Sequence, residues 1–215
     1  MDPAPPDDQH LRAHLKRELR KRRQGVRRAM SADARRRRSA PLLERVRSLR
    51  EWGEARTLLA FVPMPTEVQL QPLVEEAWAD ARSVAAPRMA QDLADLEVRA
   101  WTADTALEES GMGFFQPPPD APEAPLATID LVLVPALAVD DQGFRLGYGR
   151  GYYDRLLPRL PHAFRLAVVF DFELMAELPV LPWDEPVHAV VTDQRVLRFG
   201  SPEARGPSPS SRGPV

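Results

Sequence analysis

The fold is decided by the run IDLVLV at residues 129–134, followed by PALAVDDQGFRLGYGRGYYDR at residues 135–155. Apart from Asp130 the first run is apolar, which is typical of a strand buried on both faces of a parallel sheet. Open parallel sheets bind ligands beyond the carboxyl ends of their strands. The glycine-containing loop that follows residue 134 is therefore the first place where we expect a binding site.

Similar apolar runs on either side of this strand predict the rest of a sheet. Further strands are expected at residues 57–62, 83–86, 96–101, 165–170, 189–192 and 196–199. Strands that alternate with helices predict the α/β class. We expect a three-layer α/β/α arrangement around a mostly parallel, Rossmann-like open sheet.

Helices are predicted in the intervening segments. Their expected ranges are 11–30, 32–52, 66–81, 151 to Pro158, and 173–178. Ser31 is a suitable N-cap for the second helix. Thr66 and Gln69 have the spacing of a capping box at the start of the third.

Length and composition suit one globular domain at residues 10–200, with disordered tails at 1–9 and 201–215. The 215 residues include no cysteine, which excludes disulfides, thiolate catalysis and cysteine-ligated zinc. No apolar run is long enough to span a bilayer, and the amino terminus lacks a secretory signal. We therefore expect a cytoplasmic protein.

Charge is distributed unevenly along the chain. Sixteen of the 29 lysines and arginines lie in residues 10–50, whereas the remainder of the chain is acidic. An anion is expected where the two parts meet. A nucleic-acid-binding protein is the alternative, but the basic segment lacks a known binding motif and interleaved aromatic residues.

The loop itself contains residue types that bind phosphate. Three glycines at alternate positions in residues 147–151 allow backbone amides to approach a ligand closely. Arg145 and Arg150 offer charge-assisted hydrogen bonds, and Asp154, in the first turn of the next helix, suits Mg²⁺. The alternative is a glycine-rich turn with exposed arginines and a helix-start aspartate.

RLGYGRGYYDRLL at residues 145–157, after LVPALAVDDQGF at 133–144, resembles the signature of the 5-formyltetrahydrofolate cyclo-ligase family, also called methenyltetrahydrofolate synthetases. The resemblance extends over residues 15–199. It implies conversion of 5-formyltetrahydrofolate to 5,10-methenyltetrahydrofolate, with ATP as co-substrate, Mg²⁺ as cofactor, and release of ADP and phosphate. We expect a monomer that binds neither membrane nor nucleic acid. Its folate substrate is expected with or without a polyglutamate tail. A nucleotide-binding relative without this turnover is the alternative.

The resemblance extends to the segment KRELR at residues 16–20, which the family uses to reach ATP. Lys16 and Arg20 lie four positions apart, so a helix places them on one face, where they can clamp an anion. A solvated basic helix is the alternative. The implied ATP-binding residues are Lys16, Arg17, Glu18, Leu19, Arg20, Arg145, Leu146, Gly147, Tyr148, Gly149, Arg150, Gly151, Tyr152 and Tyr153.

The folate is implied to contact Val62, Glu67, Phe115, Tyr148 and Tyr152. A carboxylate such as Glu67 can accept two hydrogen bonds from the amino-pyrimidinone edge of a pterin. Its alternative role is to favour the start of the helix predicted at Thr66. The turn at residues 86–88, which ends in Arg88, is expected to shape the same pocket. Gln116 stands where many family members have Glu.

The resemblance also implies that Asp154 and Asp184 bind Mg²⁺, and that Arg145, Arg150 and Asp154 are catalytic. Two distant acids suit the water-rich coordination of Mg²⁺. The alternative for Asp184 is a proline-rich turn. His188, where many relatives have Asp, is expected to be structural.

Overall fold

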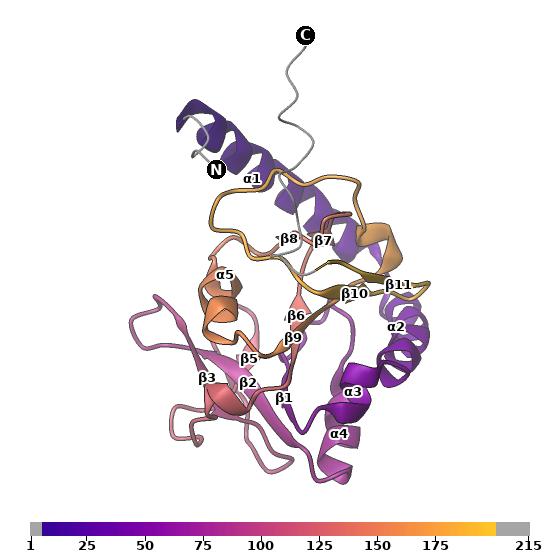
Figure 1. Ribbon diagram of the computed structural model, residues 1–215, viewed down its shortest axis with the longest axis vertical. Coiled ribbons are helices and arrows are strands. Elements are labelled where there is room, and N and C mark those ends of the chain that lie inside the picture. Colours follow the sequence, from indigo (N-terminus) through magenta and orange to yellow (C-terminus); the bar gives the residue numbers. More distant parts are fainter. Residues whose placement is uncertain (1–5, 201–215) are drawn as a thin grey trace.

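The computed structural model describes residues 6–200, and the expected tail residues 1–5 and 201–215 lie outside the described part. A seven-stranded sheet has the order β11-β10-β9-β6-β1-β2-β3 (Figure 1). Its strands are β1 Thr57–Leu59, β2 Ser83–Met89, β3 Leu96–Ala100, β6 Leu131–Pro135, β9 Phe164–Val168, β10 Ala189–Val191 and β11 Val196–Arg198. The five inner strands are parallel, and β3 and β11 pair antiparallel at the edges. The predicted α/β class and mostly parallel open sheet are confirmed.

The other elements are short, apart from the first two helices. The helices are α1 Pro6–Ala29, α2 Ala32–Arg47, α3 Arg50–Glu54, α4 Gln71–Ala79 and α5 Tyr152–Leu156, with 3-10 turns η1 Leu126–Thr128, η2 Leu157–Arg159 and η3 Asp171–Glu173. Two small hairpins pair β4 Glu108–Glu109 with β5 Phe115–Gln116, and β7 Ala138–Val139 with β8 Arg145–Leu146. No helix within residues 6–200 is long and apolar enough to cross a membrane.

Strand β6 shows how the layers are made. Leu131 and Leu133 pack with α2, α3 and α4 on one face of the sheet, whereas Val132 and Val134 pack with α5 and η2 on the other. Each fully buried side chain of this size contributes about 1.5–3 kcal/mol relative to exposure. Helix α1 belongs to neither layer and lies across the carboxyl ends of the strands (Figure 1).

Two helix boundaries differ from those predicted. Ser31 caps α2 as expected, by accepting from the amide of Ala34. The helix expected to reach residue 52 instead breaks at Ser48 and Leu49, where Leu49 is extended and buried. Helix α1 begins at Pro6, so residues 6–9, predicted to be part of a disordered tail, are helical. The helix starting at Gly151 does end before Pro158, at Leu156.

The capping box predicted at Thr66 is wrong. Helix α4 begins at Gln71, where Pro72 in the first turn suits a start without a backbone N–H. Gln69 instead donates its side-chain amide to the carbonyl of Glu67, and its backbone amide donates to Ser39. The segment before α4 is therefore a loop that turns Glu67 inward.

The prediction of a helix at residues 173–178 is also wrong. Only the 3-10 turn η3 forms, and Leu174 after it is extended. Burial of the Glu173 side chain at the end of this turn fixes the local conformation, because its carboxylate accepts from the amide of Phe170 at 2.9 Å.

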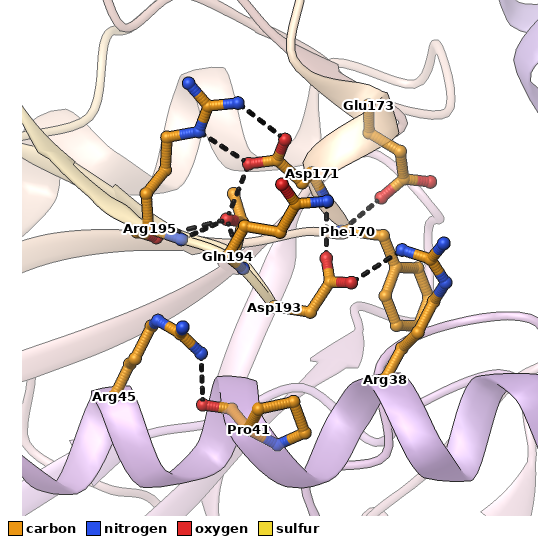
Figure 2. Close-up of polar contacts among 10 residues, drawn as sticks. Arg38, Pro41, Arg45, Phe170, Asp171, Glu173, Asp193, Gln194 and Arg195 are labelled. Atoms are coloured by element: carbon orange, nitrogen blue, oxygen red, sulfur yellow. Dashed lines mark hydrogen bonds and ion pairs between the residues drawn. The ribbon is translucent and has the colours of Figure 1, made fainter.

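Charged side chains fasten α2 to the turns after β9 and β10 (Figure 2). Arg38 donates to Asp193 at 2.6 Å, and Asp193 accepts from the amide of Asp171 at 2.7 Å. Arg195 makes two further bonds to the Asp171 carboxylate, at 2.8 and 2.7 Å. All these groups are partnered, so this network is structural.

Candidate active site

A cavity of about 900 Å³ opens at the carboxyl ends of the parallel strands, where the sequence predicted a binding site. Residues from α1, the segment after β1, the end of β6, the glycine loop and the segment before β10 line it. Of the predicted site residues, it brings together Lys16, Arg17, Arg20, Val62, Glu67, Phe115, Arg145, Gly147, Tyr148, Gly149, Arg150, Gly151, Tyr152, Tyr153, Asp154 and Asp184.

Lys16 and Arg20 line the cavity from one face of α1, as their spacing predicted. The ammonium of Lys16 is buried in an ion pair with Asp184. Burial lowers the pKa of Lys16, against the opposing charges of Asp184 and Asp154. Arg20 donates through Nε to the carbonyl of Gly147 at 2.9 Å, so α1 holds the glycine loop directly.

The glycine loop has the backbone that its sequence predicted. Gly149 has φ 105° and Gly151 has φ 68°, both in the left-handed region that glycine adopts without steric cost. Within residues 6–200, no backbone amide from Gly147 to Gly151 donates a hydrogen bond to the protein. These free donors suit an anionic ligand. Helix α5 has only five residues, so its dipole adds less than the sequence suggested.

Asp154 and Asp184 approach the same part of the cavity. Oδ1 of Asp154 accepts from Arg145 Nη2 at 3.0 Å and from the amide of Glu185, next to Asp184, at 3.2 Å. Oδ2 of Asp184 accepts from Lys16 and, at 2.7 Å, from the amide of Leu181. In the described part of the chain, the second oxygen of each carboxylate has no hydrogen-bond partner.

This donor set fits Mg²⁺, which takes one or two carboxylates and completes its shell with water and phosphate oxygens. No group of three or more His, Cys, Asp or Glu side chains in residues 6–200 could form a metal site made of protein ligands alone. Any metal held here therefore depends on ligands supplied by a phosphate or by water.

Another part of the wall is apolar and contains one buried carboxylate. Glu67 accepts from the hydroxyl of Tyr148 at 2.8 Å and from the amide of Met64 at 2.9 Å. Burial raises the pKa of Glu67, while the nearby charge of Arg27 opposes that effect. Burial, and then the charge of Glu67, raises the pKa of Tyr148 above its ordinary value. The surrounding wall contains Phe61, Val62, Met64, Pro87, Phe114 and Phe115.

The two tyrosines that begin α5 have different surroundings. The hydroxyl of Tyr152 donates to the carbonyl of Leu93 at 2.9 Å, in the turn between β2 and β3. The hydroxyl of Tyr153 is buried without a partner among the described residues, and its ring centroid lies 5.7 Å from the guanidinium carbon of Arg145. Burial raises the pKa of Tyr153.

Three residues predicted to contact ATP do not line the cavity. Glu18 is on the exposed side of α1, where it pairs with Lys21. The other two are Leu146, which belongs to a buried apolar cluster, and Leu19, which packs against that cluster. The helical repeat and the alternation of β8 turn these side chains away. The family segment thus contains both cavity residues and packing residues.

Three further residues that the family resemblance singled out are hydrogen-bonded to other parts of the protein. Arg88 donates to Glu108 and to the carbonyl of Pro117, whereas its neighbour Pro87 lines the cavity. Gln116 is buried and accepts from the amide of Met89 at 3.0 Å. His188 accepts through Nδ1 from the amide of Arg165 at 3.0 Å, which agrees with the structural role expected for it.

The sequence analysis missed Arg27 and Glu173, which form a buried ion pair beside Glu67 and Tyr148. A helical signal for Arg27 was present. Lys16, Arg20, Arg23 and Arg27 follow one another at intervals of four, three and four residues, which places them on one face of α1. Nothing in the local sequence around Glu173 distinguished it from an exposed helical glutamate.

Comparisons with known proteins point to one family. The model of the 5-formyltetrahydrofolate cyclo-ligase family matches residues 12–193. The chain is 32% identical to the Escherichia coli K12 5-formyltetrahydrofolate cyclo-ligase, over 67% of this chain and 82% of that one. It is 36% identical to the Mycolicibacterium smegmatis cyclo-ligase, over 65% and 75%. The NMR structure of Aquifex aeolicus 5,10-methenyltetrahydrofolate synthetase superposes with a TM-score of 0.77 at 28% identity, covering 92% of this chain and 100% of that one.

Proposed function

Because this chain belongs to the 5-formyltetrahydrofolate cyclo-ligase family and catalyses the ATP-dependent conversion of 5-formyltetrahydrofolate to 5,10-methenyltetrahydrofolate, we propose that both substrates bind in the cavity at the carboxyl ends of its strands. The observation that carries the proposal is the set of residues that line this cavity. Cationic side chains and free glycine amides line it together with an apolar wall and one buried carboxylate.

ATP phosphates bind at the wall formed by α1 and the glycine loop. Lys16, Arg20, Arg145 and Arg150 neutralise phosphate charge there, and the amides of residues 147–151 donate to phosphate oxygens. Arg145 is held against Asp154 at 3.0 Å, so its guanidinium is oriented before the nucleotide arrives. Phosphoryl transfer requires positioning and charge neutralisation more than a protein nucleophile, and this wall supplies both.

Asp154 and Asp184 would hold Mg²⁺ beside Lys16, through the carboxylate oxygens that have no partner among residues 6–200. The metal would supply charge neutralisation at the transferred phosphate. Lys16 and Arg145 are each within hydrogen-bond distance of one of these carboxylates, so they hold both acids in place.

The folate binds at the apolar wall. Glu67 accepts hydrogen bonds from the amino-pyrimidinone edge through the lone pairs that Tyr148 and Met64 leave free, and Val62 and Phe115 contact the rings. Tyr152 contributes its ring rather than its hydroxyl, which is engaged by Leu93. The formyl oxygen attacks the terminal phosphate of ATP and releases ADP. The nitrogen at position 10 then attacks the formyl carbon and loses its proton, which the departing phosphate takes up as the ring closes.

The two substrate sites are tested by measuring KM for each substrate separately in Arg20→Met and Glu67→Gln, with product followed by the absorbance of methenyltetrahydrofolate. Loss of the Arg20 charge is expected to raise KM for ATP, and loss of the Glu67 charge to raise KM for 5-formyltetrahydrofolate. An exchange of these effects, or equal effects on both substrates, would contradict the assignment. We also propose that the enzyme acts in the cytoplasm and is a monomer. Light scattering of the purified protein tests the monomeric state.

A further inference from the structure

Arg27 has no role in the proposed chemistry, yet it is among the most completely partnered side chains near the cavity. Its side chain is 3% exposed. Nε and Nη2 donate to the two carboxylate oxygens of Glu173, and Nη2 also donates to the carbonyl of Ala136. Nη1 donates to the hydroxyl of Tyr148 at 2.8 Å and lies 3.5 Å from Oε1 of Glu67. These hydrogen bonds use four of the five N–H groups of the guanidinium, and Nη1 carries the fifth beside Glu67.

The partners of Arg27 come from four separate segments. Glu67 follows β1, Ala136 follows β6, Tyr148 belongs to the glycine loop, and Glu173 follows β9. Arg27 therefore joins α1 to the carboxyl ends of three neighbouring parallel strands and to the loop that closes the cavity. Glu173 fixes the guanidinium by a two-point contact, which leaves the Nη1 edge directed at Glu67 and Tyr148.

The charge of Arg27 matters because the Glu67 side chain is buried in the wall of the cavity. Besides Arg27, the groups that act on the Glu67 carboxyl are the hydroxyl of Tyr148, the amide of Met64 and the negative charge of Glu173. The charge of Glu67 in turn acts on Tyr153, at the start of α5. Among these neighbours Arg27 is the one cation. A protonated Glu67 would present a donor to the donor edge of the pterin, so recognition requires the ionised form.

We propose that Arg27, oriented by Glu173, is a positioning residue for folate recognition: it holds the Glu67 carboxylate and the Tyr148 hydroxyl in place and keeps that carboxylate ionised. The inference rests on the folate role proposed for Glu67. It assigns a role to the ion pair of Arg27 and Glu173, which contacts Glu67 and Tyr148 and is not expected to touch the substrate itself.

The test uses the double variant Arg27→Met, Glu173→Gln, which removes the buried pair without leaving Glu173 as an unpaired charge. We expect kcat/KM for 5-formyltetrahydrofolate to fall on the order of 100-fold, while KM for ATP stays within about twofold. Without the Arg27 charge, burial raises the pKa of Glu67 further. The pH midpoint of kcat/KM for the folate should therefore move upward, with activity recovering as pH rises.

Arg27→Lys is the matched variant and keeps the native Glu173. Its ammonium supplies the charge but not the five-donor fork, so the pH midpoint should return toward that of the wild type while KM for the folate stays elevated. This variant also provides the test if the double variant does not fold. Circular dichroism and thermal unfolding establish that each protein compared is folded.

Two results would overturn the inference: an unchanged pH midpoint in the folded double variant, or, in either variant, equal changes in KM for ATP and for the folate. Such results would mean that the pair only attaches α1 to the sheet. Glu67→Gln separates this outcome from failure of the folate assignment itself. If Glu67→Gln leaves KM for the folate unchanged, the proposed role of Glu67 fails, and the inference about Arg27 fails with it.

Discussion

The ammonium of Lys16 and the carboxylate of Asp184, which are 168 positions apart in the chain, form an ion pair on the wall of the cavity. Their side chains are 5% and 7% exposed. The pair brings the basic amino-terminal helix to the acidic segment before β10, where the charge distribution predicted an anion site. It also places a cation beside an expected metal ligand, so phosphate and metal sites share one set of charges.

Lys16→Met should affect ATP and stability together. Removing the ammonium takes a charge from the phosphate site and leaves Asp184 buried without its partner, which costs about 3–5 kcal/mol. We expect KM for ATP to rise at least about tenfold and KM for 5-formyltetrahydrofolate to change little. Steady-state kinetics and urea unfolding measure the two effects. An unchanged KM for ATP in the folded variant would remove Lys16 from the phosphate site.

Gly149→Ala tests the glycine loop. A Cβ at this position, where φ is 105°, would lie 3.2 Å from the guanidinium carbon of Arg20. The strained backbone costs about 1–2 kcal/mol, and Arg20 must move away from the carbonyl of Gly147. We expect a lower melting temperature and a KM for ATP raised by roughly tenfold.

Gly25→Ala is the matched control for that variant. Gly25 is exposed near the carboxyl end of α1, and nothing lies within 4 Å of an added Cβ. Alanine there should stabilise the protein by about 0.5–1 kcal/mol and leave the kinetics unchanged. Similar kinetic losses in both alanine variants would show that the effect of Gly149→Ala is not local to the loop.

Tyr153→Phe removes a buried hydroxyl that has no partner in residues 6–200. An unpaired buried hydroxyl costs about 1–3 kcal/mol, so the variant should be as stable as the wild type or more stable. If a bound substrate satisfies this hydroxyl, kcat/KM should fall even though stability does not. Thermal unfolding and kinetics on the same samples make the comparison. Full activity in a stabilised Tyr153→Phe would exclude a hydrogen bond from Tyr153 to either substrate.

Because of the network in Figure 2, the free energy of unfolding should depend on pH in the acidic range. The hydrogen bonds from Arg195 hold the pKa of Asp171 below its ordinary value. The unfolded chain therefore binds this proton more readily, so the stabilisation is present above about pH 4 and is lost as pH falls through the folded-state pKa.

Asp171→Asn should consequently lower the free energy of unfolding by about 1 kcal/mol at pH 7, because Arg195 is half exposed, and by less at pH 3. Urea titrations at the two pH values measure this difference. The exposed pair of Arg50 and Glu54 is a suitable comparison, because Glu54→Gln should leave the free energy of unfolding nearly unchanged at both pH values. A loss for Asp171→Asn that is the same at both pH values would contradict the ionic origin.

The sequence predicted the parts of the fold that depend on local pattern. The apolar run at residues 129–134 indicated a buried parallel strand, and the glycines that follow it indicated the loop at its carboxyl end. Lys16 and Arg20 were placed on one face by helical spacing alone. These predictions succeeded because periodicity and glycine conformation are properties of short segments.

What the sequence could not predict depends on contacts between distant segments. A helix was predicted to begin at Thr66, but it begins at Gln71, and the preceding loop turns the Glu67 carboxylate inward to accept from Tyr148 and Met64. Glu173 was predicted to begin a helix, but Arg27, 146 positions away, binds its carboxylate. In both cases tertiary contacts of a buried carboxylate override local propensity, and single-segment patterns do not report such contacts.

The most direct test of the account follows the absorbance of methenyltetrahydrofolate after 5-formyltetrahydrofolate, Mg²⁺ and ATP are mixed with the wild type and with Asp154→Ala. Asp154 lines the cavity beside Arg145 and near Asp184, so both the phosphate site and the proposed metal site depend on it. We predict product formation that requires ATP in the wild type, and at least a 100-fold lower rate in the folded variant, on the order of the loss of a principal charge at a phosphoryl-transfer site. Full activity of Asp154→Ala would contradict the assignment of this cavity as the site of ATP-dependent ring closure.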